Sequence, residues 1–388
     1  MRNKEVSKVI FWLSFFILVY TYLVYPFIIW LLSSLYPKPV KKGSITPKIS
    51  FIVVVYNEER YIMNKIENIF SLDYPKENLE VIVLSDGSTD NTNVILKEYS
   101  SKYTNYKFII SKERIGKVNM LRKVLPYLGG EIIVFSDARQ IFAQDALKKL
   151  ASNFFDDTVG CVSGELVFKG ENESGVAKGV SFYWRYEKLM RKWESNIYSM
   201  IGATGAIYAV RRKLLVPPPP NTILDDMFIP LKVVEKSFRV VFENEAKAYD
   251  KVATTSEEEF TRKVRTLAGN FQLFVLFKRE LNPFFNPIFA WELFSHKLLR
   301  AIAFFFLIIL FVTNFFIRDI FPYNVFFLLQ VIFYFLGIVS AIIEKLNFKI
   351  KLLSLPYVFI ILNLASLVGF LRFIFGKQDV KWEKAISK

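Results

Sequence analysis

The chain has 388 residues, with 51 Lys and Arg against 36 Asp and Glu, which gives a formal net charge of +15. It is 53% hydrophobic, yet it contains a single Cys and a single His. A disulfide within the chain and a zinc site built from several Cys or His are therefore excluded. A Ser-His-Asp triad would depend on His296, which lies between apolar runs. The chemistry must rest on carboxylates, basic side chains, backbone dipoles or a bound cation.

Long apolar runs lie at both ends of the chain. Val9–Leu32 carries no charge and, at about 1.5 Å per helical residue, is long enough to cross the roughly 30 Å core of a bilayer. It is too long for the core of a signal peptide, so we expect a retained anchor within residues 1–35. Three more runs predict three transmembrane helices within residues 297–376, and thus an integral membrane protein. These runs are Ala301–Ile317, Phe321–Ile343 and Leu352–Leu371.

The remaining segments complete the predicted organisation. Residues 36–266 have the mixed composition of one water-soluble α/β domain. Residues 267–296 are aromatic and mostly apolar but include charges and Asn-Pro breaks, so we expect interfacial amphipathic helices in contact with membrane lipids. Residues 377–388 form a basic tail. Lysines in 38–48 and 345–351 favour a cytoplasmic soluble domain, although the basic residues of both termini leave the charge argument nearly tied.

Short apolar, β-branched runs alternate with helical patterns in the soluble segment. This alternation predicts a parallel, doubly wound sheet, whose ligands bind beyond the carboxyl ends of the strands. Turns that contain carboxylates follow three of the four runs. No Gly-rich dinucleotide motif and no P-loop motif is present, and no basic and aromatic module suggests nucleic acid as a partner. The predicted strands are 49–55, 79–84, 107–110 and 131–135.

Six motifs in this segment occur in the order and approximate spacing typical of one enzyme family. They are Tyr56-Asn57-Glu58-Glu59, Ser85-Asp86-Gly87-Ser88-Thr89-Asp90, Gly116-Lys117, Phe135-Ser136-Asp137-Ala138, Gly202-Ala203-Thr204-Gly205-Ala206 with Arg211-Arg212, and Ile223-Leu224-Asp225-Asp226. A basic motif, Arg262-Lys263-Val264-Arg265, follows. Over roughly Lys48–Asn270 the chain resembles family 2 glycosyltransferases. With its flanking spans it is similar to membrane-embedded polysaccharide synthases, such as the catalytic subunits of poly-N-acetylglucosamine, hyaluronan and cellulose synthases.

The resemblance implies a GT-A fold and an inverting transfer from a UDP-sugar. Asp226 would be the general base, a role that typically contributes about 10²–10⁴-fold. Lys117 opens a helix, where its ammonium and the backbone N–H groups favour a diphosphate. On residues alone, the less favoured alternative is that Asp225-Asp226 is an N-cap and first-turn acid of a helix over Met227–Lys236. The implied nucleotide-sugar-binding residues are Tyr56, Asn57, Glu58, Asp86, Lys117, Asp137, Arg139, Arg262 and Arg265, and the implied acceptor-binding residues are Gly202, Thr204, Gly205 and Asp225.

Two departures from the family pattern matter. The family's Asp-x-Asp turn is Asp137-Ala138-Arg139 here, so one carboxylate is missing. Mg²⁺ or Mn²⁺ needs only one or two carboxylates, so we expect Asp137 to hold the metal. Alternatively, Arg139 itself would neutralise the phosphate. The final motif, Arg262–Thr266, lacks the Gln and Trp of processive synthases, which places polymer threading in doubt, and its basic residues could simply face lipid headgroups.

Three functions follow from these observations. The favoured one is a membrane-bound enzyme that extends a polysaccharide and is coupled to its export, with accessory export subunits as partners. The alternative is transfer of one sugar to a lipid-linked acceptor. A non-catalytic export subunit with a degenerate domain is the third, which the intact Asp86, Lys117 and Asp226 argue against.

Overall fold

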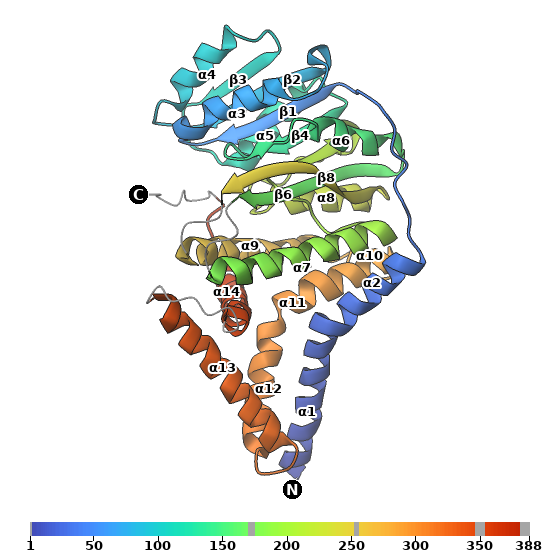
Figure 1. Cartoon of the computed structure of the whole chain (residues 1–388), viewed down its shortest axis with the longest axis vertical. Coiled ribbons are helices and arrows are strands. Elements are labelled where there is room, and N and C mark those ends of the chain that lie inside the picture. Colours follow the sequence, from blue (N-terminus) through green and yellow to red (C-terminus); the bar gives the residue numbers. More distant parts are fainter. Residues whose placement is uncertain (1, 170–174, 252–255, 346–353, 381–388) are drawn as a thin grey trace. The chain divides into compact units, whose positions relative to one another are not determined.

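The computed structural model describes residues 2–169, 175–251, 256–345 and 354–380 (Figure 1). The chain divides into two compact units, and we describe each by itself. The first takes Met1–Leu35, Gly170–Met190 and Val252–Gln378, and the second takes Tyr36–Lys169, Arg191–Lys251 and the last residues. Of the predicted segments, the start of the run Leu352–Leu371 and residues 381–388 of the basic tail lie outside the described residues.

The second unit is built on a mixed eight-stranded sheet in the order β3-β2-β1-β4-β7-β6-β8-β5. Its first four strands in that order are parallel, whereas β7 is antiparallel to both of its neighbours. The four strands expected from sequence are thus confirmed, and β2 continues to Asp86. The strands are β1 Ile49–Val55, β2 Leu79–Asp86, β3 Tyr106–Ser111, β4 Ile132–Ser136, β5 Ile141–Phe142, β6 Val159–Lys169, β7 Tyr208–Arg211 and β8 Arg239–Lys251.

Helices follow these strands as the alternating pattern predicts (Figure 1). All seven residues of β1 are buried, and Ile62, Ile66 and Ile69 of the following helix pack in the same core. This burial explains why a run of β-branched residues forms a central strand. The helices are α3 Glu59–Ser71, α4 Thr92–Ser100, α5 Lys117–Val124, α6 Ala146–Ser152 and α8 Asp225–Glu235, while α7, Gly175–Ile197, begins in the first unit and ends in the second.

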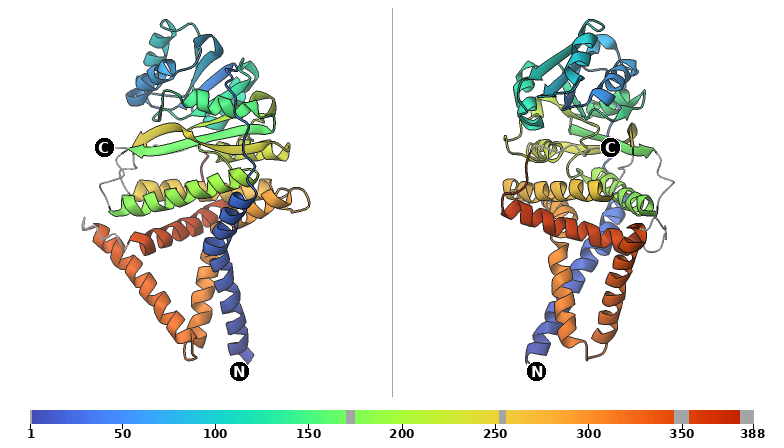
Figure 2. Two further views of the ribbon diagram at one scale, coloured as in Figure 1. Left: turned by 45° about the vertical axis from the view of Figure 1, so that its right-hand side comes forward. Right: turned by 90° about the vertical axis from the view of Figure 1, so that its left-hand side faces the viewer.

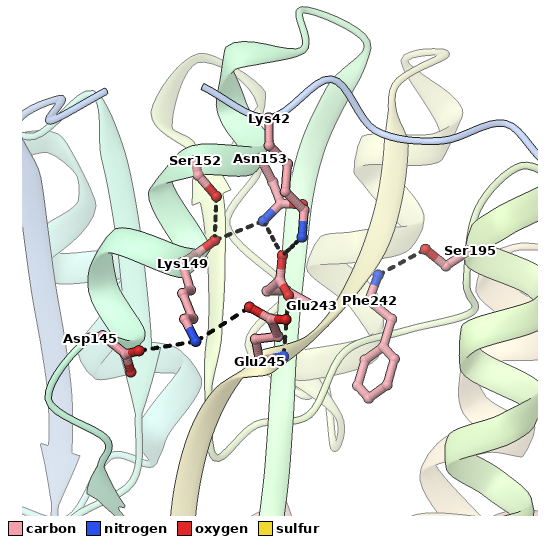
Figure 3. A network of polar contacts seen from close by, with 9 residues as sticks. All are labelled: Lys42, Asp145, Lys149, Ser152, Asn153, Ser195, Phe242, Glu243 and Glu245. Atoms are coloured by element: carbon pink, nitrogen blue, oxygen red, sulfur yellow. Dashed lines mark hydrogen bonds and ion pairs between the residues drawn. The ribbon is translucent and has the colours of Figure 1, made fainter. Parts of the chain in front are cut away.

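A buried carboxylate fixes the bulge in β8 (Figure 3). The register between β6 and β8 shifts from Gly164↔Glu243 to Glu165↔Lys247. The Glu243 side chain accepts hydrogen bonds from Asn153 Nδ2 at 2.8 Å and from the backbone N–H of Glu245 at 3.1 Å. Lys42 Nζ lies 2.6 Å from the same carboxylate. The Glu243 carboxylate therefore joins the segment before β1 to β8 and to Asn153.

The first unit is helical (Figure 2). Helices α1 and α12 lie side by side, with Phe11, Leu310, Ile317 and Tyr323 in one apolar cluster. A Cβ on Gly369 of α14 would lie 3.0 Å from the backbone N of Ala268, so small residues let α14 approach α9 closely. The helices are α1 Arg2–Val19, η1 Tyr20–Val24, α2 Tyr25–Leu35, α9 Ser256–Leu276, α10 Pro287–Glu292, η6 Leu293–Leu298, α11 Leu299–Ala301, α12 Ala303–Ile317, α13 Tyr323–Lys345 and α14 Ser354–Ile374.

Three of these helical segments are long and apolar enough to cross a membrane: Asn3–Leu35, Tyr323–Ile343 and Leu355–Ile374. A fourth span results if Pro287–Ala301 and Ala303–Ile317, which are bent by 57° at their break, count as one. The expected four spans therefore depend on this bent pair within the described part of the chain.

A buried ion cluster involves the bent pair. The carboxylate of Glu187 on α7 lies 2.7 Å from Lys297 Nζ, 3.0 Å from Arg300 Nη1 and 3.2 Å from His296 Nε2. Burial opposes the charge of Glu187, but Lys297, His296 and Arg300 outweigh it and hold its pKa well below the usual value. The lone histidine thus pairs with Glu187, a buried carboxylate on α7.

Candidate active site

Two turns at the carboxyl ends of β1 and β2 are tied to each other, and we call Tyr56–Glu59 and Ser85–Asp90 the polar turn pair. Asn57 has a φ of 55°, in the left-handed region that Asn tolerates better than most residues. Its Oδ1 accepts from the backbone N–H of Thr89 at 2.7 Å, and its own N–H donates to Ser88 Oγ at 3.1 Å. The backbone N–H of Glu58 donates to Thr92 Oγ1 at 2.9 Å. Asn57 and Glu58, both predicted to bind the nucleoside, therefore also join the first turn to the second turn and to the residue that follows it closely, Thr92.

Asp86 fixes the loop before α5. It is 3% exposed, and its carboxylate accepts backbone N–H bonds from Ile115 at 2.7 Å and from Gly116 at 2.9 Å. Within the same loop, the Arg114 guanidinium lies 3.9 Å from the centre of the Tyr56 ring. Sequence reasoning missed Arg114, although a basic residue two positions before Gly116-Lys117 was a signal.

The next group of residues carries the charges of the site. Lys117 is the first residue of α5, as predicted, and its Nζ lies 3.2 Å from Asp225 Oδ2 and 3.4 Å from Asp137 Oδ1. Burial lowers the pKa of Lys117, but Asp225, Asp137 and Asp226 outweigh this and raise it above its usual value. These four residues come from the start of α5, the turn after β4 and the start of α8, and we call them the charged cluster.

Asp226 is held by the Gly202–Ala206 motif. Its Oδ2 accepts from the backbone N–H of Gly205 at 3.1 Å, and its backbone carbonyl accepts from Ala203 N–H at 2.8 Å. A Cβ on Gly205 would lie 2.9 Å from Asp226 Oδ2, so a glycine is needed at this approach. The two motifs that the resemblance separates into acceptor and base residues thus form one structural element.

Two other residues that the resemblance assigns to acceptor binding, Gly202 and Thr204, have contacts within the second unit. Gly202 has a φ of 76°, which lies in the left-handed region. The Thr204 hydroxyl accepts a hydrogen bond from Arg191 Nη1. The backbone N–H of Thr204 donates to Ser163 Oγ at 3.0 Å. Arg191, on α7, was not recognised in the sequence because it lies outside every motif.

The N-cap interpretation of Asp225 is wrong. The helix α8 begins at Asp225 and its N-cap is Leu224, so both aspartates belong to the first turn. The Asp225 side chain faces Lys117 instead of capping backbone N–H groups. Asp225 and Asp226 point to different partners, because successive helical residues do not face each other.

The turn after β4 presents Asp137 and Arg139. The side chain of Asp137 is 50% exposed, and that of Arg139 is 53% exposed. Arg139 Nη2 lies 3.9 Å from Asp250 Oδ2, on β8, which also accepts from Gln140 Nε2 at 2.6 Å. Arg139 thus has a carboxylate neighbour that sequence spacing could not reveal.

Arg262 and Arg265 are not among the residues that the second unit brings together. Both lie on α9, in the first unit, and Arg262 pairs with Glu259 one turn earlier on that helix. Their predicted contact with the diphosphate stays a prediction.

The carboxylates fit a lightly coordinated metal. Among residues 2–169, 175–251, 256–345 and 354–380, no group of three or more His, Cys, Asp or Glu could hold an ion. Mg²⁺ and Mn²⁺ are commonly bound through one or two carboxylates, with phosphate oxygens and water completing the shell. Asp137, half exposed beside Lys117, fits that arrangement.

Several known proteins are similar to this chain. Residues 50–215 match the family model described as glycosyl transferase family 2. The chain is 24% identical over 366 residues to a probable glycosyltransferase, YdaM, of Bacillus subtilis, an alignment that covers 87% of this chain and 86% of the relative. It is 24% identical over 281 residues to the poly-β-1,6-N-acetyl-D-glucosamine synthase of Staphylococcus aureus, which covers 67% of this chain and 66% of that one.

Two further similarities extend this set. Over 146 residues the chain is 34% identical to a β-monoglucosyldiacylglycerol synthase of Nostoc sp., but this covers 37% of the chain and 31% of the relative. The mannosyltransferase PcManGT of Pyrobaculum calidifontis, solved in complex with GDP-Man and Mn²⁺, matches 97% of this chain and 99% of its own with a TM-score of 0.73 at 20% identity. That likeness shows the fold and confirms the GT-A prediction.

Proposed function

Because residues 50–215 form a family 2 glycosyltransferase domain, we propose that this glycosyltransferase moves a sugar from a UDP-sugar to a hydroxyl of a growing polysaccharide at a membrane. The observation that carries the proposal is the charged cluster beside Gly205. In this cluster the Asp226 carboxylate accepts a hydrogen bond from the backbone N–H of Gly205, and Lys117 lies between Asp137 and Asp225. Sugar transfer needs a carboxylate to take the proton of the acceptor hydroxyl and a cation to stabilise the charge of the leaving diphosphate.

The reaction assigns one task to each part. The acceptor hydroxyl attacks the anomeric carbon, and the bond from that carbon to the diphosphate oxygen breaks on the opposite face. Asp226 takes the hydroxyl proton, and the N–H of Gly205 keeps its carboxylate oriented. Lys117 stabilises the negative charge that develops on the diphosphate. The configuration at the anomeric carbon is therefore inverted.

Asp137 would hold a divalent cation in this scheme. A bound Mg²⁺ or Mn²⁺ would neutralise part of the diphosphate charge. Arg139 is the alternative counter-charge. With EDTA in the assay, we expect activity to fall and to return on addition of Mn²⁺. Unchanged activity would assign the neutralising role to Arg139 and Lys117.

A lipid-linked acceptor is the second candidate, since the final motif lacks the Gln and Trp of processive synthases. Similarity to a β-monoglucosyldiacylglycerol synthase, a lipid glycosyltransferase by its name, points the same way. The apolar helices of the first unit would then anchor the enzyme instead of forming an export path.

One assay separates the two acceptors. Membranes that contain the protein are incubated with radiolabelled UDP-sugars, and with GDP-sugars as a second donor class, and the product is extracted and sized. High-molecular-weight product supports the polysaccharide, whereas one sugar on an extractable lipid supports the second candidate. Absence of transfer with every donor, when Asp226→Asn membranes serve as the blank, would contradict both.

Reporter fusions in the loop after α2 test the proposed cytoplasmic placement of the second unit.

A further inference from the structure

A lysine is completely buried beneath the turn that follows β4. Lys65, on α3, is 0% exposed. Its Nζ donates to Ser136 Oγ and to the backbone carbonyl of Gln140, each at 2.7 Å. These two acceptors stand at the first and last positions of the turn that bears Asp137 and Arg139. Lys65 thus connects both ends of this turn from within the core.

The surroundings of Lys65 make this contact costly and specific. The rings of Phe142 and Phe51 lie 4.3 Å and 5.4 Å from its Nζ. Burying an amine among apolar side chains costs free energy unless the amine is hydrogen-bonded. The turn supplies those acceptors, so amine and turn fix each other's position.

The same turn is held on two further sides. Ser136 Oγ lies 2.9 Å from the carbonyl of Ala206, next to the Gly205 that contacts Asp226. Gln140 Nε2 donates to Asp250 at 2.6 Å. Lys65 therefore lies at the base of a network that leaves only the side chains of Asp137 and Arg139 half exposed.

We propose that Lys65 is a positioning residue for the donor site, which fixes the Ser136–Gln140 turn so that Asp137 and Arg139 are presented to the diphosphate. This inference rests on the proposed function, because it requires a nucleoside diphosphate donor. Lys65 touches neither donor nor acceptor itself. It acts on donor affinity through the turn.

The test measures UDP binding to the full-length protein in detergent with Mn²⁺ by calorimetry. GDP replaces UDP as the probe if the wild type prefers it. In Lys65→Met, which keeps the apolar stem and removes the donors, we expect about 10-fold weaker binding, as for loss of two buried hydrogen bonds. Lys65→Arg should recover part of the affinity. The matched control is Lys148→Met, which removes an exposed α6 lysine paired to Asp73 and should bind like the wild type.

A double-mutant cycle distinguishes positioning from general stability. If Lys65 acts through the turn, Lys65→Met should weaken binding far less when Asp137→Asn is already present, because the effects of coupled residues are not additive. Full additivity, or wild-type binding by a folded Lys65→Met protein, would overturn the inference. If Lys65→Met does not fold, Ser136→Ala decides. It removes one of the two acceptors of Lys65 and leaves the Gln140 carbonyl, so binding should be about 3-fold weaker, and unchanged binding is the contradicting result. A wild type that binds no nucleoside diphosphate and transfers no sugar would instead refute the proposed function.

Discussion

The polar turn pair lies at the carboxyl ends of β1 and β2, whereas the charged cluster joins the turn after β4 to the first turns of α5 and α8. The contacts of the two regions differ in kind. Neutral side-chain and backbone hydrogen bonds join Asn57 to Ser88 and Thr89. In the charged cluster, Lys117 lies between Asp137 and Asp225. The bonds of Asn57 define the shape of the first region, whereas the second region concentrates charge where, in the proposed reaction, a diphosphate and a proton are handled. Changes in the two regions should therefore affect different quantities.

The largest effect is expected at Asp226. Asp226→Asn keeps the size of the side chain but removes the base, so kcat should fall by about 10²–10⁴-fold while UDP binding stays near the wild-type value. Steady-state transfer rates at saturating donor and acceptor check this. Asp157→Asn, at a fully exposed carboxylate, is the control. A mutant that transfers sugar at the wild-type rate would remove Asp226 from the mechanism.

Lys117→Met should have the next largest effect. It leaves Asp137 and Asp225 without their shared cation and removes charge stabilisation from the leaving diphosphate, so kcat/KM for the donor should fall by about 10²-fold. Lys123→Met, at an exposed lysine on the same helix, should change little. Equal activity of the two variants would show that the cluster does not bind the diphosphate.

Gly205→Ala tests the element that holds the base. The added Cβ would lie 2.9 Å from Asp226 Oδ2 and displace the carboxylate, so kcat should fall by about 10-fold with little change in donor KM. Gly129→Ala is the matched control, since its Cβ would meet nothing closer than 3.6 Å. An unchanged kcat would mean that the position of Asp226 tolerates this shift.

The smallest effect on rate is expected in the polar turn pair. Asn57→Ala places alanine at a φ of 55° and removes the bond to Thr89 N–H, which should cost about 1–3 kcal/mol of folding free energy. Thermal unfolding should show a lower midpoint, while kcat falls less than 3-fold, as expected for a change away from the reacting groups. Asn64→Ala, exposed on α3, controls for the loss of an Asn. A 100-fold loss of kcat would contradict a mainly shaping role.

The regular part of the fold could be predicted because each strand buries a continuous apolar run. Ile49–Val55 is buried at all seven positions, and the sequence shows this directly. The antiparallel placement of β7 could not be read, since strand order depends on long-range pairing that no local pattern encodes. The same applies to β8, whose bulge is fixed by Glu243 and by Lys42 from a distant segment.

The site was partly predictable for a related reason. Lys117 and Asp226 belong to short motifs that the family resemblance singles out, and the structure brings Lys117 together with Asp137 and Asp225. Lys65 and Arg191 were missed, because their partners are more than ten residues away in sequence. For Lys65 a signal existed: it follows Ile62 by three residues on the apolar face of α3 and is the charged exception there.

The most direct test of the division between the two regions is the kcat of Asp226→Asn and Asn57→Ala, measured side by side at saturating donor and acceptor. The charged cluster should carry the chemistry, so kcat should drop by about 10²–10⁴-fold in the first variant and stay within about 3-fold of wild type in the second. Similar losses of kcat in the two variants would contradict this account.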